Sequence, residues 1–277
     1  MRVPYLHEVF PSLSLLYPFS FENDFVLSWQ PEFCAESMQY AVALCALYCI
    51  LCYSGRHIMA NRSPFDLKWA LAGWNLLLAT FSFCGAVRTA PFLIHSIYER
   101  GLYHSICSEA TDHYGNGPVG LWVALFIFSK VPELIDTFFI VVRKKPLIFL
   151  HWYHHITVLM FCWHAFAVRS ASGLYFVAMN YSVHAIMYFY YFLTAIGYRP
   201  QWALMVTIVQ LSQMVVGVAV CTMSVLYIRQ GDACYVDHSN LKWGILMYSS
   251  YFILFLKFFI ERYCFPQKRT PTKKKTQ

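Results

Sequence analysis

The stretch WALMVTIVQLSQMVVGVAVCTMSVLYI, residues 202–228, contains no charged side chain. A helix needs about 20 predominantly apolar residues to span the roughly 30 Å hydrocarbon layer of a bilayer, and it satisfies its backbone polar groups internally. The stretch is long enough to do this. It therefore predicts a transmembrane helix, and with it a fold built inside a membrane.

Six further stretches on either side of it are also predominantly apolar and long enough to span. They cover residues 37–55, 69–87, 119–142, 147–168, 173–197 and 243–260, of which 119–142 contains three charges and 243–260 is interrupted by Lys257. Over the 277 residues, 58% are hydrophobic and 13% are charged, whereas a soluble domain carries about 25% charged residues. This excludes a soluble domain and a disordered chain. We predict an all-α integral membrane protein with seven transmembrane helices, and a short interfacial or re-entrant segment at residues 89–98 between the second and the third.

The basic side chains predict how these helices are oriented. Loops rich in Lys and Arg stay cytoplasmic, and most of the 21 Lys and Arg residues lie in alternate loops and in the C-terminal tail. We expect a non-cytoplasmic segment over residues 1–36, a membrane domain over 37–265 and a basic cytosolic tail over 266–277. The net charge of +7 suits an anionic lipid surface or CoA phosphates better than nucleic acid.

Two of the ten cysteines fall in predicted non-cytoplasmic loops, Cys107 in the second loop and Cys234 in the sixth. A disulfide forms and persists on that side of a membrane. We therefore predict a bond between them. The alternative is that they are two unrelated reduced thiols.

The third stretch carries polar side chains that need a reason to be inside a membrane. A charge at the centre of a spanning helix costs about 2.5 to 3.5 kcal/mol on insertion scales. Lys130, Glu133, Asp136 and Thr137 are three or four residues apart or adjacent, so they extend along one flank of a helix. A charge pair that only fixes helix packing is the alternative, but three charges and a hydroxyl exceed what packing requires.

The fourth stretch opens with His151, His154 and His155, which project from one helix face near the cytoplasmic end. One buried histidine is usually structural, whereas three at this spacing favour a functional site. The next two stretches also have polar faces. Their members are Asn180, His184, Tyr188, Tyr191, Gln210 and Gln213. Gln in a span often only joins helices, but four successive polar faces predict one histidine-lined chamber open to the cytoplasm.

Three chemistries compete for such a chamber. Membrane desaturases and hydroxylases bind iron with about eight histidines in several boxes, but this chain has eleven histidines and only one box. A single metal ion on three imidazoles remains a minor alternative. A receptor or transporter would have similar hydropathy without turnover. The third chemistry is a neutral imidazole that attacks an activated acyl group directly.

Four runs together resemble the very-long-chain fatty acid elongase (ELO) family. They are Lys130-x-x-Glu133-x-x-Asp136-Thr137, His151-x-x-His154-His155, Asn180-x-x-x-His184-x-x-Met187-Tyr188-x-Tyr190-Tyr191 and Thr207-x-x-Gln210-x-x-Gln213. Their order and spacing agree with the family, and the likeness extends from the first span to the tail. It looks most similar to the branch that acts on saturated and monounsaturated chains.

The resemblance implies a condensing enzyme with an acyl tunnel, which joins a long-chain acyl-CoA to malonyl-CoA and gives 3-oxoacyl-CoA, CoA and CO2. It implies that His154 accepts the acyl group and that His184 lies near the reacting carbonyl. His151 and His155 would be base, orienting or oxyanion groups. The remaining polar residues of the four faces would bind substrate. Arg143 and Lys144 would meet CoA phosphates, although topology alone also explains that basic loop.

The resemblance also implies a location and partners. An endoplasmic-reticulum membrane enzyme is expected, with a lumenal N-terminus, and Lys274 and Lys275 look like a cytosolic dilysine retrieval signal. Expected partners are the bilayer, both CoA substrates, and the reductase, dehydratase and enoyl-CoA reductase of the elongation cycle. A homo-oligomer is compatible with this, and no cofactor or metal is expected.

Overall fold

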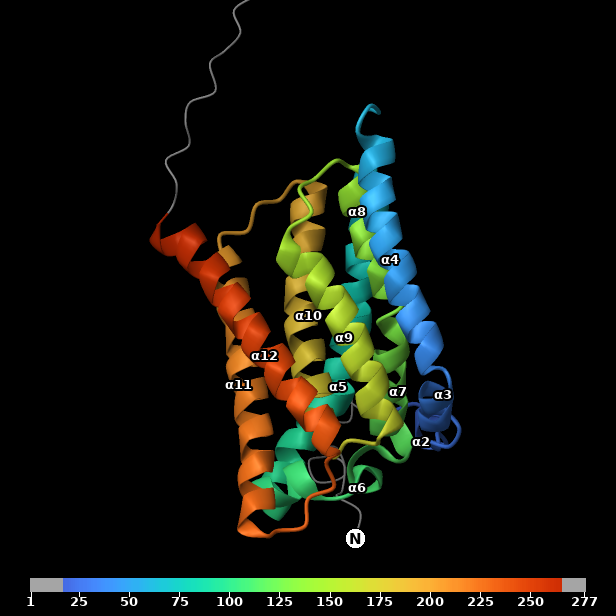
Figure 1. Ribbon diagram of the computed structural model, residues 1–277, viewed down its shortest axis with the longest axis vertical. Coiled ribbons are helices and arrows are strands. Elements are labelled where there is room, and N and C mark those ends of the chain that lie inside the picture. The colour runs from blue at the N-terminus through green and yellow to red at the C-terminus, as the bar shows by residue number, and fades with distance from the viewer. Residues whose placement is uncertain (1–16, 266–277) are drawn as a thin grey trace, which may run out of the picture.

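The computed structural model describes residues 17–265, which form a helical bundle with its long helices roughly side by side (Figure 1). Within that range the chain has no β-strand, and an isolated bridge joins Val26 to Asn116. The elements are α2 (Ser20–Asn23), α3 (Gln30–Glu36), α4 (Met38–Met59), α5 (Lys68–Cys107), α6 (Ala110–Tyr114), α7 (Gly117–Ser129), η2 (Pro132–Leu134), α8 (Ile135–Val142), α9 (Phe149–Ala167), α10 (Gly173–Ile196), α11 (Ala203–Gln230), α12 (His238–Phe259) and η3 (Ile260–Cys264). The predicted tail 266–277, with Lys274 and Lys275, lies outside the described residues.

Four helices in the described range are long and apolar enough to cross a membrane: α4, α5, α11, and α12 together with η3. They coincide with the first, second, sixth and seventh predicted spans. α9 and α10 cover the fourth and fifth spans, but they contain five histidines as well as Asn180 and several tyrosines, which lower their hydropathy. The chain is thus an all-helical, multi-pass membrane protein, whereas the count of seven spans stays a prediction.

The third predicted span, 119–142, is not one helix, so that expectation was wrong. α7 ends at Ser129, and the 3-10 turn η2 leads into α8. Pro132 has no N–H and cannot continue an α-helical hydrogen-bond pattern. The N–H groups of Lys130 and Val131 bond instead to carbonyls three residues back, at 3.3 and 3.2 Å, as in a 3-10 turn. The break lies where the polar residues of this segment begin.

The separate interfacial segment predicted at residues 89–98 is also absent, because α5 continues through Pro91 as one element as far as Cys107, with a kink at Gly101. α5 packs along α10 over much of its length. This contact keeps α5 helical through Pro91, which on its own would favour a break. The helices approach closely at Gly85, where an added Cβ would lie 2.4 Å from the ring of Tyr181.

One end of the bundle is tied together by polar and covalent contacts. Cys107 at the end of α5 and Cys234 in the loop before α12 form a disulfide, which is the pairing that the sequence predicts. Beside it, the N–H of Tyr235 donates to the carbonyl of Cys107 at 2.9 Å. These contacts fix the start of α12 against α5. α9 lies across the bundle with α4 on one side and α12 on the other (Figure 1).

Candidate functional site

The histidine box of α9 faces a cavity of about 180 Å³ near the start of that helix. The backbone of Ile148 is extended, and α9 begins at the next residue, Phe149. The three histidines of the box therefore lie in the first two turns of the helix. Four other elements, η2, α8, α10 and α11, contribute polar lining residues. The cavity is lined by Glu133, Asp136, His151, His154, His155, Asn180, His184, Tyr188, Tyr191, Gln210 and Gln213, with apolar residues that include Met214 and Phe255. All four histidines predicted to be catalytic thus share one cavity.

His151 is held by a chain of hydroxyl groups, and the ring of His155 lies beside it. The two imidazole rings have centroids 4.5 Å apart. His151 Nε2 hydrogen-bonds with Thr137 Oγ1 at 3.0 Å, and Thr137 Oγ1 hydrogen-bonds with Tyr48 OH at 2.6 Å. Tyr48 belongs to α4 and Thr137 to α8, so three elements fix the orientation of His151.

His154 is held differently. Its Nδ1 atom is buried and has no hydrogen-bond partner in the described part of the chain. The ring lies 5.0 Å from that of Tyr251 and 5.8 Å from that of His155, measured between centroids. A buried polar atom without a partner costs free energy and is rare in folded proteins. His154 therefore keeps an unused ring nitrogen inside the protein.

Opposite the histidine box, a line of hydrogen bonds joins α7, η2 and α10. Lys130 Nζ donates to both carboxylate oxygens of Glu133, at 2.8 and 2.9 Å, and to Asn180 Oδ1 at 3.3 Å. Asn180 Nδ2 donates to His184 Nε2 at 3.2 Å. All four side chains are buried. A buried ammonium that is paired and hydrogen-bonded places a fixed positive charge close to His184.

Asp136 is held by two neutral donors. Trp74 Nε1 and Tyr188 OH each donate to one of its oxygens at 2.6 Å. Gln210 Nε2 contacts Met187 Sδ at 3.1 Å. Tyr191 and Gln213 line the same cavity. The polar faces that the sequence predicts on four successive segments therefore do converge on one space.

A second cavity, of about 460 Å³, adjoins the first. The two share Asp136, Ile148, His151, Tyr188 and Tyr191 as lining residues. Its other lining residues include two basic side chains, Arg143 and Lys145. The second cavity thus forms a basic vestibule next to the histidine cavity.

The structure places Lys144 away from this vestibule. Its Nζ donates to the carbonyls of Ala60 and Arg62, at 2.9 and 3.1 Å, just beyond the end of α4. The reason is local, since Lys144 has a positive φ of 53° that turns the chain between its two basic neighbours. Lys145 lines the vestibule instead.

Sequence reasoning missed Tyr48, Trp74 and Tyr251. Each contacts a site residue from a distant helix, and each lies in an apolar run where an aromatic residue is unremarkable on sequence alone. No pattern within α4, α5 or α12 singles them out. Among the described residues, no group of three or more His, Cys, Asp or Glu side chains is arranged to hold a metal ion.

Comparison with known proteins adds an independent finding. The model of the GNS1/SUR4 family (ELO) matches residues 33–274. The chain is 42% identical to very long chain fatty acid elongase 6 of Drosophila melanogaster, over 90% of this chain and 80% of the relative. It is 39% identical to very long chain fatty acid elongase 6 of Homo sapiens, over 94% and 97%. It is 44% identical to very long chain fatty acid elongase 4 of Trypanosoma cruzi, over 82% and 81%.

Proposed function

Because the chain belongs to the GNS1/SUR4 (ELO) family, whose members include fatty acid elongases, we propose that it is the condensing enzyme of fatty acid elongation. Its reaction would be that of a 3-oxoacyl-CoA synthase. A long-chain acyl-CoA and malonyl-CoA give 3-oxoacyl-CoA, free CoA and CO2. Elongation and a membrane location follow from the family and the fold, and the chemistry below is the proposal.

The observation that carries the proposal is the state of His154. Its imidazole is half-buried, carries a buried Nδ1 atom without a hydrogen-bond partner in the described part of the chain, and faces the same small cavity as His184. Covalent catalysis needs a nucleophile that is not already engaged and a group that stabilises the developing oxyanion. His154 offers the first of these, and the Asn180–His184 pair, backed by Lys130, offers the second.

The acyl transfer step then has defined roles. An imidazole nitrogen of His154 attacks the thioester carbonyl carbon, the C–S bond breaks, and CoA leaves as a thiol with the proton that the imidazole loses. In this proposal His184 and Asn180 stabilise the negative charge on the carbonyl oxygen, which is supported by their hydrogen bond at the cavity wall. His151, which hydrogen-bonds with Thr137, is positioned to orient the box and to move the proton.

Condensation follows on the same histidine. Decarboxylation of malonyl-CoA gives a carbanion equivalent at its α-carbon, which attacks the acyl carbon. The C–N bond to His154 breaks, the freed imidazole nitrogen takes up a proton, and 3-oxoacyl-CoA leaves with the CO2 already released from malonyl-CoA. Arg143 and Lys145 line the vestibule, where CoA phosphates would be matched by basic side chains. The product would pass to a 3-oxoacyl-CoA reductase, a 3-hydroxyacyl-CoA dehydratase and an enoyl-CoA reductase in the endoplasmic-reticulum membrane.

Incubation of the purified protein with palmitoyl-CoA alone tests the proposal. We expect free CoA to be released in an amount stoichiometric with the protein, and mass spectrometry to find an acyl adduct on the peptide with His154. His154→Ala should abolish the release and lower overall condensation about a thousandfold or more. His57→Ala, on the exposed end of α4, is the matched control and should keep both. CoA release only after malonyl-CoA is added, with no adduct, would favour direct attack without an acyl-histidine.

A further inference from the structure

The buried hydrogen bonds opposite the histidine box run in one direction, and Lys130 fixes that direction. An ammonium group has three N–H donors and no acceptor. Lys130 Nζ has three acceptors around it, the two carboxylate oxygens of Glu133 at 2.8 and 2.9 Å and Asn180 Oδ1 at 3.3 Å. The ring of Phe126 lies beside the ammonium, with its centroid 4.0 Å from Nζ. All three donors of Lys130 are therefore used inside the protein.

Lys130 itself lines neither the histidine cavity nor the vestibule, and its exposed fraction is 2%. It can thus influence a reacting group only through its neighbours. Asn180 hydrogen-bonds with Lys130 and also lines the histidine cavity. Asn180 is therefore the side chain that carries the effect of Lys130 into the site.

The ammonium decides which way the amide of Asn180 faces. The amide oxygen must face Lys130, because an amide N–H and an ammonium N–H are both donors and repel each other. The amide nitrogen then faces His184, and Asn180 Nδ2 lies 3.2 Å from His184 Nε2. An amide nitrogen donates and does not accept. His184 Nε2 is therefore the acceptor of this hydrogen bond and carries no proton.

The position of the proton on His184 follows from this. An imidazolium would set a second donor at Nε2 against the amide N–H of Asn180, so the ring is neutral. A neutral imidazole carries one proton on one of its two nitrogens, and here that nitrogen is Nδ1. His184 lines the histidine cavity, and Nε2 is its only ring nitrogen with a hydrogen-bond partner in the described part of the chain. The Nδ1–H group is thus available to a group bound in the cavity.

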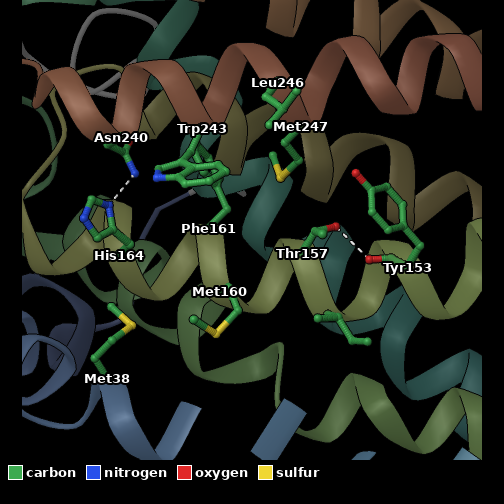
Figure 2. A pocket seen from close by; sticks show the side chains of 11 residues that line it. Met38, Tyr153, Thr157, Met160, Phe161, His164, Asn240, Trp243, Leu246 and Met247 are labelled. Carbon is green, nitrogen blue, oxygen red and sulfur yellow. Dashed lines mark hydrogen bonds between the residues drawn. The ribbon is translucent and has the colours of Figure 1, made fainter. Parts of the chain in front are cut away.

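The described chain has another asparagine–histidine pair, which lacks such a cation. Figure 2 shows Asn240 on α12 and His164 on α9, joined by a hydrogen bond between Asn240 Nδ2 and His164 Nδ1 at 3.0 Å. Among the described residues, no Lys or Arg side chain hydrogen-bonds with Asn240. No charge therefore fixes the direction of this amide, and the pair serves as an internal comparison for Asn180 and His184.

We propose that Lys130 is a positioning residue that fixes His184 as the Nδ1–H tautomer, so that His184 presents a hydrogen-bond donor, and not a base, to the histidine cavity. A donor at this place would stabilise the oxyanion that forms when a thioester or an acyl-imidazole is attacked. This catalytic role rests on the proposed function, whereas the tautomer does not. Glu133 completes the arrangement, because a buried ammonium without its partner is strongly destabilising.

Solid-state NMR of the full-length protein tests the tautomer. The protein is labelled with 13C and 15N in histidine and held in phosphatidylcholine bilayers. Protonated and unprotonated ring nitrogens differ in 15N shift, and correlation with Cγ or Cδ2 distinguishes Nδ1 from Nε2. The signals of His184 are those that disappear in His184→Gln. We expect the proton on Nδ1, and a wild-type His184 with its proton on Nε2, or with both nitrogens protonated, overturns the proposal.

The double variant Lys130→Met, Glu133→Gln tests whether Lys130 is the cause. It removes both charges of the buried pair together, which is tolerated better than the loss of one partner. Asn180 then loses its donor-only neighbour, and we expect an Nε2–H signal of His184 to appear. The rate of CoA release from palmitoyl-CoA should fall at least in proportion to the Nδ1–H that is lost, about twofold when both tautomers are equally populated. A double variant that keeps only Nδ1–H overturns the role of Lys130.

His164→Gln, in the pair without a cation, is the matched control and should leave the rate of CoA release unchanged. Wild-type CoA release in the double variant, although its His184 has lost part of the Nδ1–H form, would show that the tautomer has no part in acyl transfer and overturns the catalytic role. A wild-type protein that has Nδ1–H at His184 but condenses no acyl-CoA contradicts the proposed function and leaves the assigned tautomer standing.

Discussion

The hydroxyl of Thr137 joins α4 to the histidine box. It bonds with Tyr48 on one side and with His151 on the other, and both contacts are buried or partly buried. Because Thr137 lines neither of the two cavities and acts on the site through His151, we assign Thr137 a positioning role. Loss of one partner from a buried hydrogen bond costs about 1–3 kcal/mol. Without the Thr137 hydroxyl, the imidazole of His151 would lose the contact that fixes its orientation.

Thr137→Val should therefore lower kcat about tenfold while KM for acyl-CoA changes little, since a barrier increase of about 1.4 kcal/mol is tenfold in rate. Steady-state condensation kinetics measure this. Thr137→Ser is the matched control, because it keeps the hydroxyl and should keep most of kcat. Equal losses in both variants would show that only the packing of the methyl group matters.

At this scale the sequence predicts a good deal of the site. Most of the predicted polar residues of the third to sixth segments line one cavity, since helical spacing places them on common faces, whereas Lys130 and Thr137 reach it only through hydrogen-bonded neighbours. The sequence does not predict the roles of Tyr48, Trp74 and Tyr251. An aromatic residue in an apolar run has the same pattern whether its side chain contacts lipid or a residue of the site. The sequence also fails for Lys144, whose direction is set by one backbone angle.

Among the elements, the packing of α5 against α10 shows how tertiary contact overrides local sequence. Pro91 and Pro132 both suggest a helix break. α7 does end before Pro132, but α5 continues through Pro91. α5 is supported along α10, whereas the segment at Lys130 gains buried ionic contacts by turning. Proline position alone therefore does not predict helix ends in this fold.

Gly85→Ala should destabilise the protein by about 1–3 kcal/mol, because overpacking forces side chains and backbone to shift. The added methyl would meet the ring of Tyr181. Thermal unfolding in detergent measures this as a lower Tm. Gly73→Ala, on the same helix with no atom within 4 Å of the new Cβ, is the control and should be neutral or slightly stabilising. A Tm for Gly85→Ala equal to that of Gly73→Ala would mean that α5 and α10 separate without cost.

At the scale of the whole molecule, Glu22 also stabilises the end of the bundle that holds the disulfide. Its carboxylate accepts hydrogen bonds from Arg88 Nε at 3.0 Å and from Trp122 Nε1 at 2.6 Å. Burial alone would raise the pKa of Glu22. The hydrogen bonds from Arg88, Trp122 and the N–H of Phe19, with the charge of Arg88, outweigh burial and lower that pKa below its ordinary value.

A lowered pKa in the folded state means that Glu22 stabilises the protein fully above the ordinary glutamate pKa. This contribution is lost as the pH falls through the lowered value. Glu22→Gln should therefore have a lower Tm than wild type at neutral pH, and the difference should shrink in acid. Tm against pH measures it, with the exposed Glu36→Gln as control. A difference that grows in acid would reverse the sign of the coupling.

The disulfide makes a separate prediction. The Cys107–Cys234 bond closes a long stretch of chain, with a sequence separation of 127, and such bonds typically contribute about 2–4 kcal/mol. The double variant Cys107→Ser, Cys234→Ser should unfold at a lower temperature and be insensitive to reductant. Wild type in reductant should match it. A wild-type Tm that reductant leaves unchanged, with the bond shown to be broken, would contradict this contribution.

The same bond has a mechanical meaning for α12. The helix begins a few residues after Cys234, so one end of it is anchored to α5 while the other end carries Phe255 and Phe258 past the histidines. A rod pinned at one end moves most at its free end. A slight swing of α12 about that anchor therefore parts it from α9 chiefly beside His154, and the anchored end acts as a pivot.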